Sequence, residues 1–584
     1  MTHWAKGIRA TLRVSALAVA AATLGFGPAQ ANGIAGDYLA ARQASFLGDF
    51  TAAALYYGRA LENDPARPEL LERAILAEMS LGDFDRAAEL AQRMEDADTP
   101  SQIARMAIIT QTASDESYAA IIKAVDEGRA IGPLADGLVK AWSLLGSGDM
   151  SAALLAFDEV AKMQGLAPFA AYHKALALAS VGDFETASSI FEEDQAGGMS
   201  GTRRGVMARA EILSQLGQTD AAVELLDENF GADLDPELAE MRDTLAAGDR
   251  MPFSHVRSPK DGMAEVFYTL AGALSNEGSD ELTLLYARMA EHLRPDHTDA
   301  ILLSGELLSG MGRYDLAEQT FEKVPAEDPS YHAAVLGEAE ALREQGDVAA
   351  AIDVIEDLAD LQPDLTVAHT SLGDLYRQEE RYAEAVDAYT RALDLMGEDT
   401  PRQWFLYYAR AISFERQDQW EAAESDFRRA LELNPEQPQV LNYLGYSLVE
   451  QQRKLDEALD MIERAVAARP NSGYIVDSLG WVLYRLGRYE EAVPHMERAA
   501  ELMPIDPVVN DHLGDVYWAV GREREAEFMW KRALSFVDWG DSSDEANPDR
   551  IKRKLEVGLD QVLAEEGAPS LEQAAAGAGG DDEG

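Results

Sequence analysis

The chain has 584 residues, 47% of them hydrophobic, with 50 Lys and Arg against 104 Asp and Glu, a formal net charge of −54. A chain this acidic repels phosphate backbones and anionic lipid surfaces, which argues against nucleic acid and anionic membranes as partners. It contains no cysteine, which excludes disulfides, thiolate zinc sites, a cysteine nucleophile and lipid attachment through an N-terminal cysteine. The acidity indicates either a surface adapted for solubility or a site for basic ligands.

The first 31 residues have the pattern of a secretory signal peptide. Basic residues precede a short apolar run over 14–25, and the small residues Ala29 and Ala31 predict cleavage before Asn32. The run is too short to cross a membrane, and no later segment approaches the roughly 20 apolar residues that a spanning helix needs. We therefore expect no membrane anchor, secretion across the inner membrane, and a soluble protein in the bacterial periplasm.

After this segment the chain repeats one pattern at spacings of 34 or 35 residues. Each unit places a small residue in a first helix and an alanine in a second helix, and many units close with a proline. In the clearest copies, between Pro438 and Phe536, the central glycines are Gly445, Gly480 and Gly514. One hairpin cannot bury its own apolar face, so hairpins must stack. The chain thus resembles the tetratricopeptide-repeat (TPR) family.

The repeats divide into two predicted arrays. An alanine-rich array covers 32–248, with a degenerate hairpin over 102–128 and a short helix over 236–247. An irregular linker over 249–261 marks the main break, because it contains two X-Pro pairs and interrupts the period.

A more regular array covers 262–541. We expect a capping helix within 542–564 and a disordered acidic tail over 565–584, where glycine, alanine and carboxylates replace the repeat pattern. The fold class is therefore all-α, a TPR superhelical solenoid of about 14 hairpins in two arrays.

No catalytic constellation accompanies the repeats. The sequence lacks the zinc-binding HExxH helix, the GxSxG elbow, a Walker-type loop and a dinucleotide fingerprint. Its nine histidines are scattered, and its carboxylates are so abundant that close pairs are expected by chance. Because repeats fill the chain, we expect no enzyme activity, no cofactor and no metal site.

Binding to other proteins or extended peptides is the remaining activity. The TPR resemblance implies that first helices line the concave surface, with positions three before, one after and four after the small residue facing inward. In the last three units these positions, with two more one turn earlier, carry aromatic, amide and carboxylate groups. An extended peptide would suit them, although the aromatics are equally expected to pack between hairpins. The candidates are Gln439, Asn442, Tyr446, Tyr474, Asp477, Trp481, Tyr484, Asp511, Asp515 and Trp518.

The final units carry a more specific resemblance. The stretches NYLGYSL, DSLGWVLYRLG and NDHLGDVYWAVGREREAEFMWKRAL are similar to C-terminal repeats of bacterial envelope TPR lipoproteins, adaptors that deliver cell-wall hydrolases to carboxyl-terminal processing proteases. This chain lacks their anchoring cysteine. The resemblance implies a non-catalytic scaffold that presents clients to an envelope protease or assembly factor. A purely structural envelope organiser and an enzyme with an unrecognised site are the alternatives.

Overall fold

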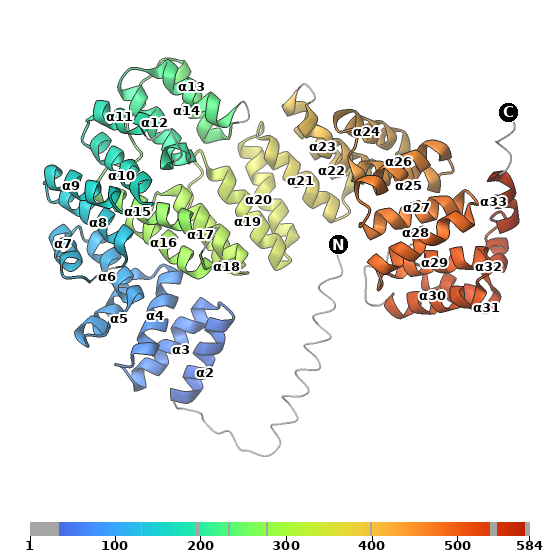
Figure 1. Cartoon of the computed structure of the whole chain (residues 1–584), viewed down its shortest axis with the longest axis horizontal. Coiled ribbons are helices and arrows are strands. Elements are labelled where there is room, and N and C mark those ends of the chain that lie inside the picture. The colour runs from blue at the N-terminus through green and yellow to red at the C-terminus, as the bar shows by residue number, and fades with distance from the viewer. Residues whose placement is uncertain are drawn as a thin grey trace. The chain divides into compact units, whose positions relative to one another are not determined.

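The computed structural model describes residues 34–129, 131–193, 198–231, 234–275, 278–397, 400–537 and 546–578 (Figure 1). These residues form thirty-two α-helices and two short 3-10 helices, and none of them lies in a strand. The predicted all-α hairpin solenoid is therefore confirmed. Fourteen hairpins run through α2–α13 and α15–α30, and the four remaining helices bring the total to the equivalent of about sixteen. The expected signal peptide, 1–31, lies outside the described residues.

The chain forms two compact units, one of described residues up to Leu358 and one from Ala359 onward. The first unit contains α2 (Ile34–Phe46), α3 (Phe50–Asn63), α4 (Pro68–Leu81), α5 (Phe84–Asp96), α6 (Gln102–Ser114), α7 (Tyr118–Asp126), α8 (Pro133–Gly146), α9 (Met150–Ala161), α10 (Ala167–Ser180), α11 (Phe184–Glu193), η1 (Met199–Gly201), α12 (Arg203–Gln215), α13 (Thr219–Phe230), α14 (Pro236–Ala246), α15 (Pro259–Leu274), α16 (Asp280–Leu293), α17 (Thr298–Gly310), α18 (Tyr314–Phe321), α19 (Tyr331–Gln345) and most of α20 (Val348–Leu361).

The second unit continues with α21 (Thr366–Gln378), α22 (Tyr382–Met396), η2 (Pro401–Gln403), α23 (Trp404–Glu415), α24 (Trp420–Leu433), α25 (Pro438–Glu450), α26 (Leu455–Ala468), α27 (Gly473–Arg485), α28 (Tyr489–Leu502), α29 (Pro507–Ala519), α30 (Glu523–Phe536), α31 (Pro548–Val557), α32 (Leu559–Glu565) and α33 (Leu571–Ala578).

Local sequence explains where the paired helices turn. Gly82 ends α4 with a φ of 84°, a left-handed conformation that glycine adopts without a Cβ penalty. Asp83 then caps α5 by accepting the Arg86 backbone N–H at 2.9 Å. Small residues in the first helix serve close packing, since a Cβ at Gly514 would lie 2.4 Å from the Trp530 ring. Both features match the roles that the sequence pattern predicts.

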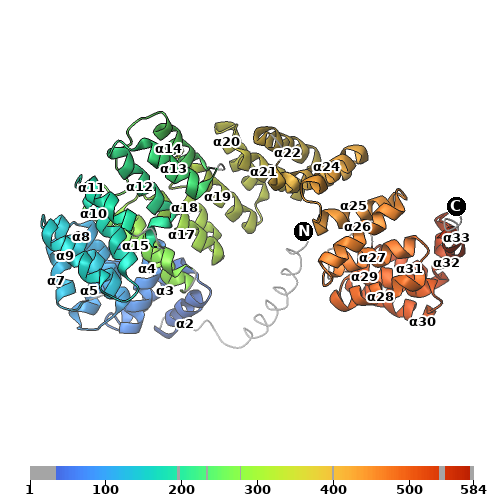
Figure 2. The same cartoon turned by 45° about the horizontal axis from the view of Figure 1, so that its top comes forward.

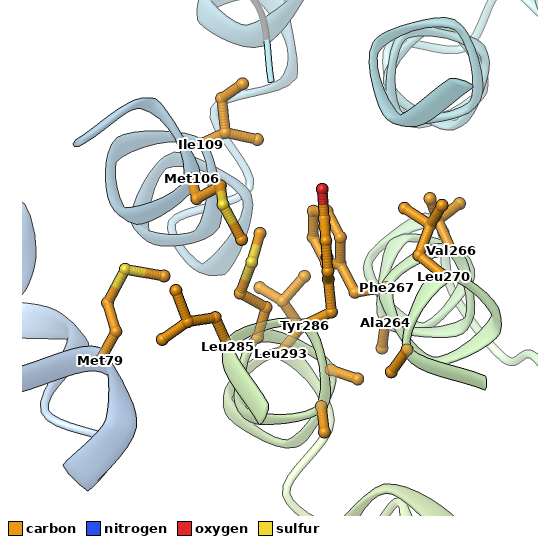
Figure 3. Close-up of a cluster of buried hydrophobic side chains, with 14 of the residues drawn as sticks. Met79, Met106, Ile109, Ala264, Val266, Phe267, Leu270, Leu285, Tyr286 and Leu293 are labelled. Atoms are coloured by element: carbon orange, nitrogen blue, oxygen red, sulfur yellow. The ribbon is translucent and has the colours of Figure 1, made fainter. Parts of the chain in front are cut away.

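The first unit contains an arrangement that the repeat pattern does not specify. The hairpin α15–α16 packs against the earlier first helices α4, α6, α8 and α10 (Figure 1), and Figure 2 shows α15 beside α10 in a second view. Met79 of α4 and Met106 of α6 point toward Leu285 of α16 (Figure 3). A Cβ at Gly262 would lie 2.3 Å from the Trp142 ring, so this glycine lets α15 cross α8 closely. The first helices of the early repeats are therefore covered by later helices of the same unit.

The loop before α15 takes part in this packing. The expected linker, 249–261, lies within the first unit, and the boundary between the compact units falls about a hundred residues later, inside α20. Ser254 donates its backbone N–H to Glu211 of α12 at 3.0 Å, and Met251 donates its own to Ser214 Oγ at 2.8 Å. The loop is thus hydrogen-bonded to α12.

The C-terminal segment also departs from the expectation. Within the range expected for a capping helix, 542–564, the described residues form α31 and most of α32. Part of the tail expected to be disordered forms α33, so that expectation is corrected for 571–578. The Tyr489 hydroxyl donates to the Leu571 carbonyl at 3.0 Å, and Leu571 packs on the core of the second unit. A few apolar and small residues are sufficient to dock an otherwise polar tail.

Candidate functional site

The predicted binding residues lie on the first helices α25, α27 and α29 of three successive repeats. The structure divides them into two groups. One group, near the start of α25 and α27, is free of the C-terminal helices and contains exposed aromatic surface. The other group lies further along α25 and α27 and on α29, and it is packed in or bonded to other elements of the second unit.

The first group forms two rows across successive helices. Six residues before each repeat's small residue stand Phe405, Gln439 and Tyr474, on α23, α25 and α27. Phe405 and Tyr474 are 42% and 46% exposed, which is unusual for large aromatic side chains. Three residues before the same markers stand Tyr408 and Asn442. We call these five residues the tyrosine–amide face.

Burial determines the hydrogen-bonding state of the polar groups on this face. Burial, and then the neighbouring Tyr474 hydroxyl, raise the pKa of Tyr408 to about 12, so the Tyr408 phenol stays a protonated donor at neutral pH. Asn442 is 8% exposed, yet no described donor reaches its Oδ1, and the same holds for the buried Gln439 Oε1. A buried acceptor without a partner costs roughly 1–3 kcal/mol. The face thus contains two buried acceptors that lack a described donor.

Tyr446 and Trp481 act mainly in packing. Tyr446 is half-buried against the core of the second unit. The Trp481 ring stacks between Tyr484 and His512, with centroids 4.8 and 3.9 Å away and interplanar angles of 17° and 13°. Its Nε1 donates to Glu450 Oε1 at 3.0 Å. The alternative role, in which aromatics pack between hairpins, describes Trp481.

The predicted carboxylates are all engaged. His512 Nδ1 lies 3.0 Å from Asp477 Oδ2, which joins α29 to α27. Lys554 of α31 donates to both oxygens of Asp511 at 2.9 Å and to Asp515 Oδ1 at 2.6 Å. Burial raises the pKa of the Asp511 carboxyl even though the Lys554 ammonium opposes this shift.

Two aromatic candidates complete the second group. Trp518 Nε1 donates to Asp560 Oδ2 at 2.9 Å, and a Cβ at Gly558 would lie 2.6 Å from the Trp518 ring. Tyr484 is buried, and burial raises its pKa well above the usual range, with the Asp515 and Tyr489 side chains adding to the shift. The candidates on α29 are therefore covered by the C-terminal helices and do not form one open surface with the tyrosine–amide face.

Two kinds of residue escaped prediction. Phe405 and Tyr408 stand in the same register as Gln439 and Asn442, so extending the inward positions one repeat toward the N-terminus would have found them. Lys554 lies outside the repeats, and no pattern in the sequence places its ammonium between two carboxylates on α29.

The described residues contain no group of three or more His, Cys, Asp or Glu side chains that could hold a metal ion. No helix in the described ranges is both long and apolar enough to cross a membrane. The face combines exposed aromatic rings with buried amide groups, a combination that suits peptide recognition.

These features define a helical-repeat protein, and sequence comparison identifies its family. One model of the tetratricopeptide repeat matches residues 38–101, 138–198, 302–366, 408–473 and 451–507, a second matches 364–436, and a third matches 204–228. Together they span more than half of the chain. The protein belongs to the tetratricopeptide-repeat family.

Curated relatives are similar over only part of their length. The TPR repeat-containing protein PA4667 of Pseudomonas aeruginosa is 26% identical over 220 residues, 37% of this chain and 30% of that protein. The human protein O-mannosyl-transferase TMTC1 is 25% identical over 175 residues, 30% of this chain and 20% of that protein. The chain thus matches less than a third of the length of either relative.

Several solved structures match the chain at low sequence identity. The Cut9–Hcn1 structure covers 89% of this chain and 95% of its own, at 14% identity and a TM-score of 0.36. YrrB, described as a TPR protein with an unusual peptide-binding site, covers 32% of this chain and 94% of its own, at 21% identity and a TM-score of 0.27. A TPR protein of Parabacteroides merdae covers 45% and 98%, at 16% identity and a TM-score of 0.36.

Proposed function

We propose that the protein is a non-catalytic scaffold that binds an extended segment of a partner protein on the tyrosine–amide face. The supporting observation is the pair of buried acceptors without a described partner, Asn442 Oδ1 and Gln439 Oε1 of α25, with the exposed rings of Phe405 and Tyr474 on the first helices before and after it. A peptide backbone supplies N–H groups at regular spacing for these acceptors, and its apolar side chains would lie against the rings.

Affinity capture from an envelope extract tests this proposal. We compare the wild-type chain with an Asn442→Ala/Tyr474→Ala double variant and identify the retained proteins by mass spectrometry. Loss of one buried hydrogen bond and one aromatic contact should weaken the bound partner about tenfold or more. The matched control is Phe528→Ala, which removes a 64% exposed ring from the second helix α30. Identical partner sets for wild type and the double variant would overturn the proposal.

We further propose that the scaffold works in the bacterial periplasm and presents clients to an envelope protease or assembly factor. The signal-peptide pattern of the first 31 residues and the amino-acid sequence of the last repeats support this role. Holding two proteins on one scaffold would raise their effective concentration for each other. Cell fractionation tests the location, and recovery of a protease together with its substrate tests the adaptor role. Recovery of wall or membrane components without any client would favour the structural organiser instead.

A further inference from the structure

The C-terminal residues 546–578 lie against the last two repeats. Helix α31 follows α30, α32 reaches Trp518 on α29, and α33 reaches Gly487 and Tyr489 at the start of α28 (Figure 1). We call this segment the C-terminal cover. It contacts Asp511, Asp515 and Trp518, which belong to the same inward register as the tyrosine–amide face.

The central contact of the cover is electrostatic. Lys554 is 1% exposed, and its ammonium is held by Asp511 and Asp515 with three donor–acceptor distances between 2.6 and 2.9 Å. Trp530 donates its Nε1 to Asp515 Oδ1 at 2.9 Å, and the Lys554 Nζ lies 5.7 Å from the Trp530 ring centroid. Two carboxylates and an indole ring thus contact one primary ammonium.

The rest of the cover buries little. In α31 only Ile551 and Lys554 are buried, and in α32 only Leu559 and Val562. The helix beneath, α29, buries ten residues from Pro507 to Tyr517. Segments with few buried apolar side chains open at lower free energy than the elements on which they pack. The cover is therefore expected to open while α29 and α30 stay folded.

Charge complementarity indicates what replaces it. Helix α31 carries Arg550, Lys552, Arg553 and Lys554 within a chain of net charge −54. When the cover opens, Asp511 and Asp515 lose the ammonium that compensates them in a largely apolar surrounding, which is costly unless another cation enters.

We propose that the C-terminal cover is a self-ligand, displaced when a basic helical segment of a partner protein inserts a lysine between Asp511 and Asp515. This inference rests on the proposed function, because it takes the surface that the cover hides to be part of the peptide-binding surface. In the covered state the peptide-binding surface ends at α27. In the displaced state Trp518 and the two carboxylates extend it onto α29.

Hydrogen exchange of the full wild-type chain is the first test. Amides of α31–α33 should exchange at least a hundredfold faster than those of α29 and α30, because the cover opens locally. Equal protection of the cover and of α29–α30 would overturn the proposal, since the cover would then open only with the repeats beneath it.

Binding of a fluorescein-labelled peptide of residues 546–566 is the second test. The full-length Lys554→Ala chain, whose own cover is weakened, should bind this peptide at least tenfold more tightly than the wild-type chain does. The control chain, Lys552→Ala, changes a lysine whose side chain is 60% exposed and which pairs with Asp549 on the same helix, and it should behave as wild type. A peptide with methionine in place of Lys554 should not bind.

The outcomes separate the alternatives. No gain of binding by the Lys554→Ala chain would overturn the proposal, and so would dimerisation that depends on chain concentration and on Lys554, because the occupant would then be a second copy. Capture of a partner by the tyrosine–amide face without opening of the cover would leave the proposed function intact and remove this inference. Opening of the cover without any captured partner would leave the displaceable cover intact and remove the proposed function.

Discussion

Both units cover first-helix surface with later parts of their own chain, but by different means. In the first unit α15 and α16 bury ten and nine residues, including Phe267, Leu285 and Tyr286 (Figure 3). In the second unit α31 and α32 bury two each, and a lysine between two aspartates makes the central contact. Apolar burial scales with area and resists opening, whereas a charge contact can be exchanged for an equivalent one. The apolar packing of α15 and α16, which we call the first closure, is thus a fixed part of the core. The C-terminal cover, which we call the second closure, is held by a contact that another cation can replace, and it is suited to regulation.

The largest expected effect lies in the polar centre of the first closure. Arg204 of α12 binds Glu265 of α15 at 2.7 Å, and Glu265 is fully buried. Burial opposes ionisation, but Arg204 holds the pKa of Glu265 well below its usual range. The change Arg204→Met leaves an uncompensated buried carboxylate and should destabilise the first unit by about 3–5 kcal/mol.

Urea unfolding monitored by hydrogen exchange in α15 measures that loss. The control Arg242→Met breaks a pair with Asp227 in which both side chains are more than a third exposed, and it should change stability little. Equal effects of the two changes would mean that the buried ion pair does not hold α15.

Truncation of a buried apolar side chain in α15 should cause a loss of stability nearly as large. Phe267→Ala in α15 empties a fully buried site whose ring lies 6.3 Å from that of Tyr286, and it should cost about 3–5 kcal/mol. Denaturant titration of the whole chain measures it, and the first unit should respond alone. The exposed Phe405→Ala in the second unit is the control, expected to change stability little. A loss below about 1 kcal/mol for Phe267→Ala would contradict the view that burial fixes this closure.

Acid should distinguish the two closures. Burial lowers the pKa of His173 to about 4, and burial followed by the Arg204 charge also lowers the pKa values of His255 and His297. The unfolded chain therefore binds more protons than the folded chain between about pH 4 and 6.5, so stability is full above about pH 6.5 and is lost as the pH falls.

Hydrogen exchange at pH 7.5 and 5.0 checks this prediction, with faster opening of α15–α17 expected at the lower pH. Burial raises the pKa of Asp511 in the second closure, a shift whose contribution to stability is lost as the pH rises, so acid should not release the C-terminal cover in the same way. Loosening of both closures to the same extent would contradict the comparison.

The smallest expected effect is at the edge of the cover. Trp518→Phe removes the Nε1 donor to Asp560 while keeping an aromatic ring. It should raise the opening rate of α32 by roughly five- to tenfold, the equivalent of about 1 kcal/mol. The control Trp404→Phe alters an indole on α23, away from the cover, and should leave α32 unchanged. An unchanged rate in the Trp518 variant would mean that this bond does not hold the cover.

The repeat architecture could be predicted because it is local. Each signal lies within one repeat of the sequence. The signals are the spacings of 34 and 35 residues, helix-ending glycines such as Gly82 and capping aspartates such as Asp83. The candidate site was predicted in part. The register identified Gln439, Asn442 and Tyr474, but the same register selected Asp511 and Asp515, whose partner is Lys554, about forty residues later and outside the repeats.

By itself the sequence determined the all-α repeat fold, because each hairpin can be recognised from the spacing of the repeats, their small residues and their turn residues. Only the tertiary structure decided which first-helix surfaces stay open. That outcome depends on contacts between segments far apart in the chain, such as Gly262 against Trp142 and Lys554 against Asp515. No periodic pattern encodes such pairs, because each rests on the shape or charge of a single residue meeting its partner across the fold.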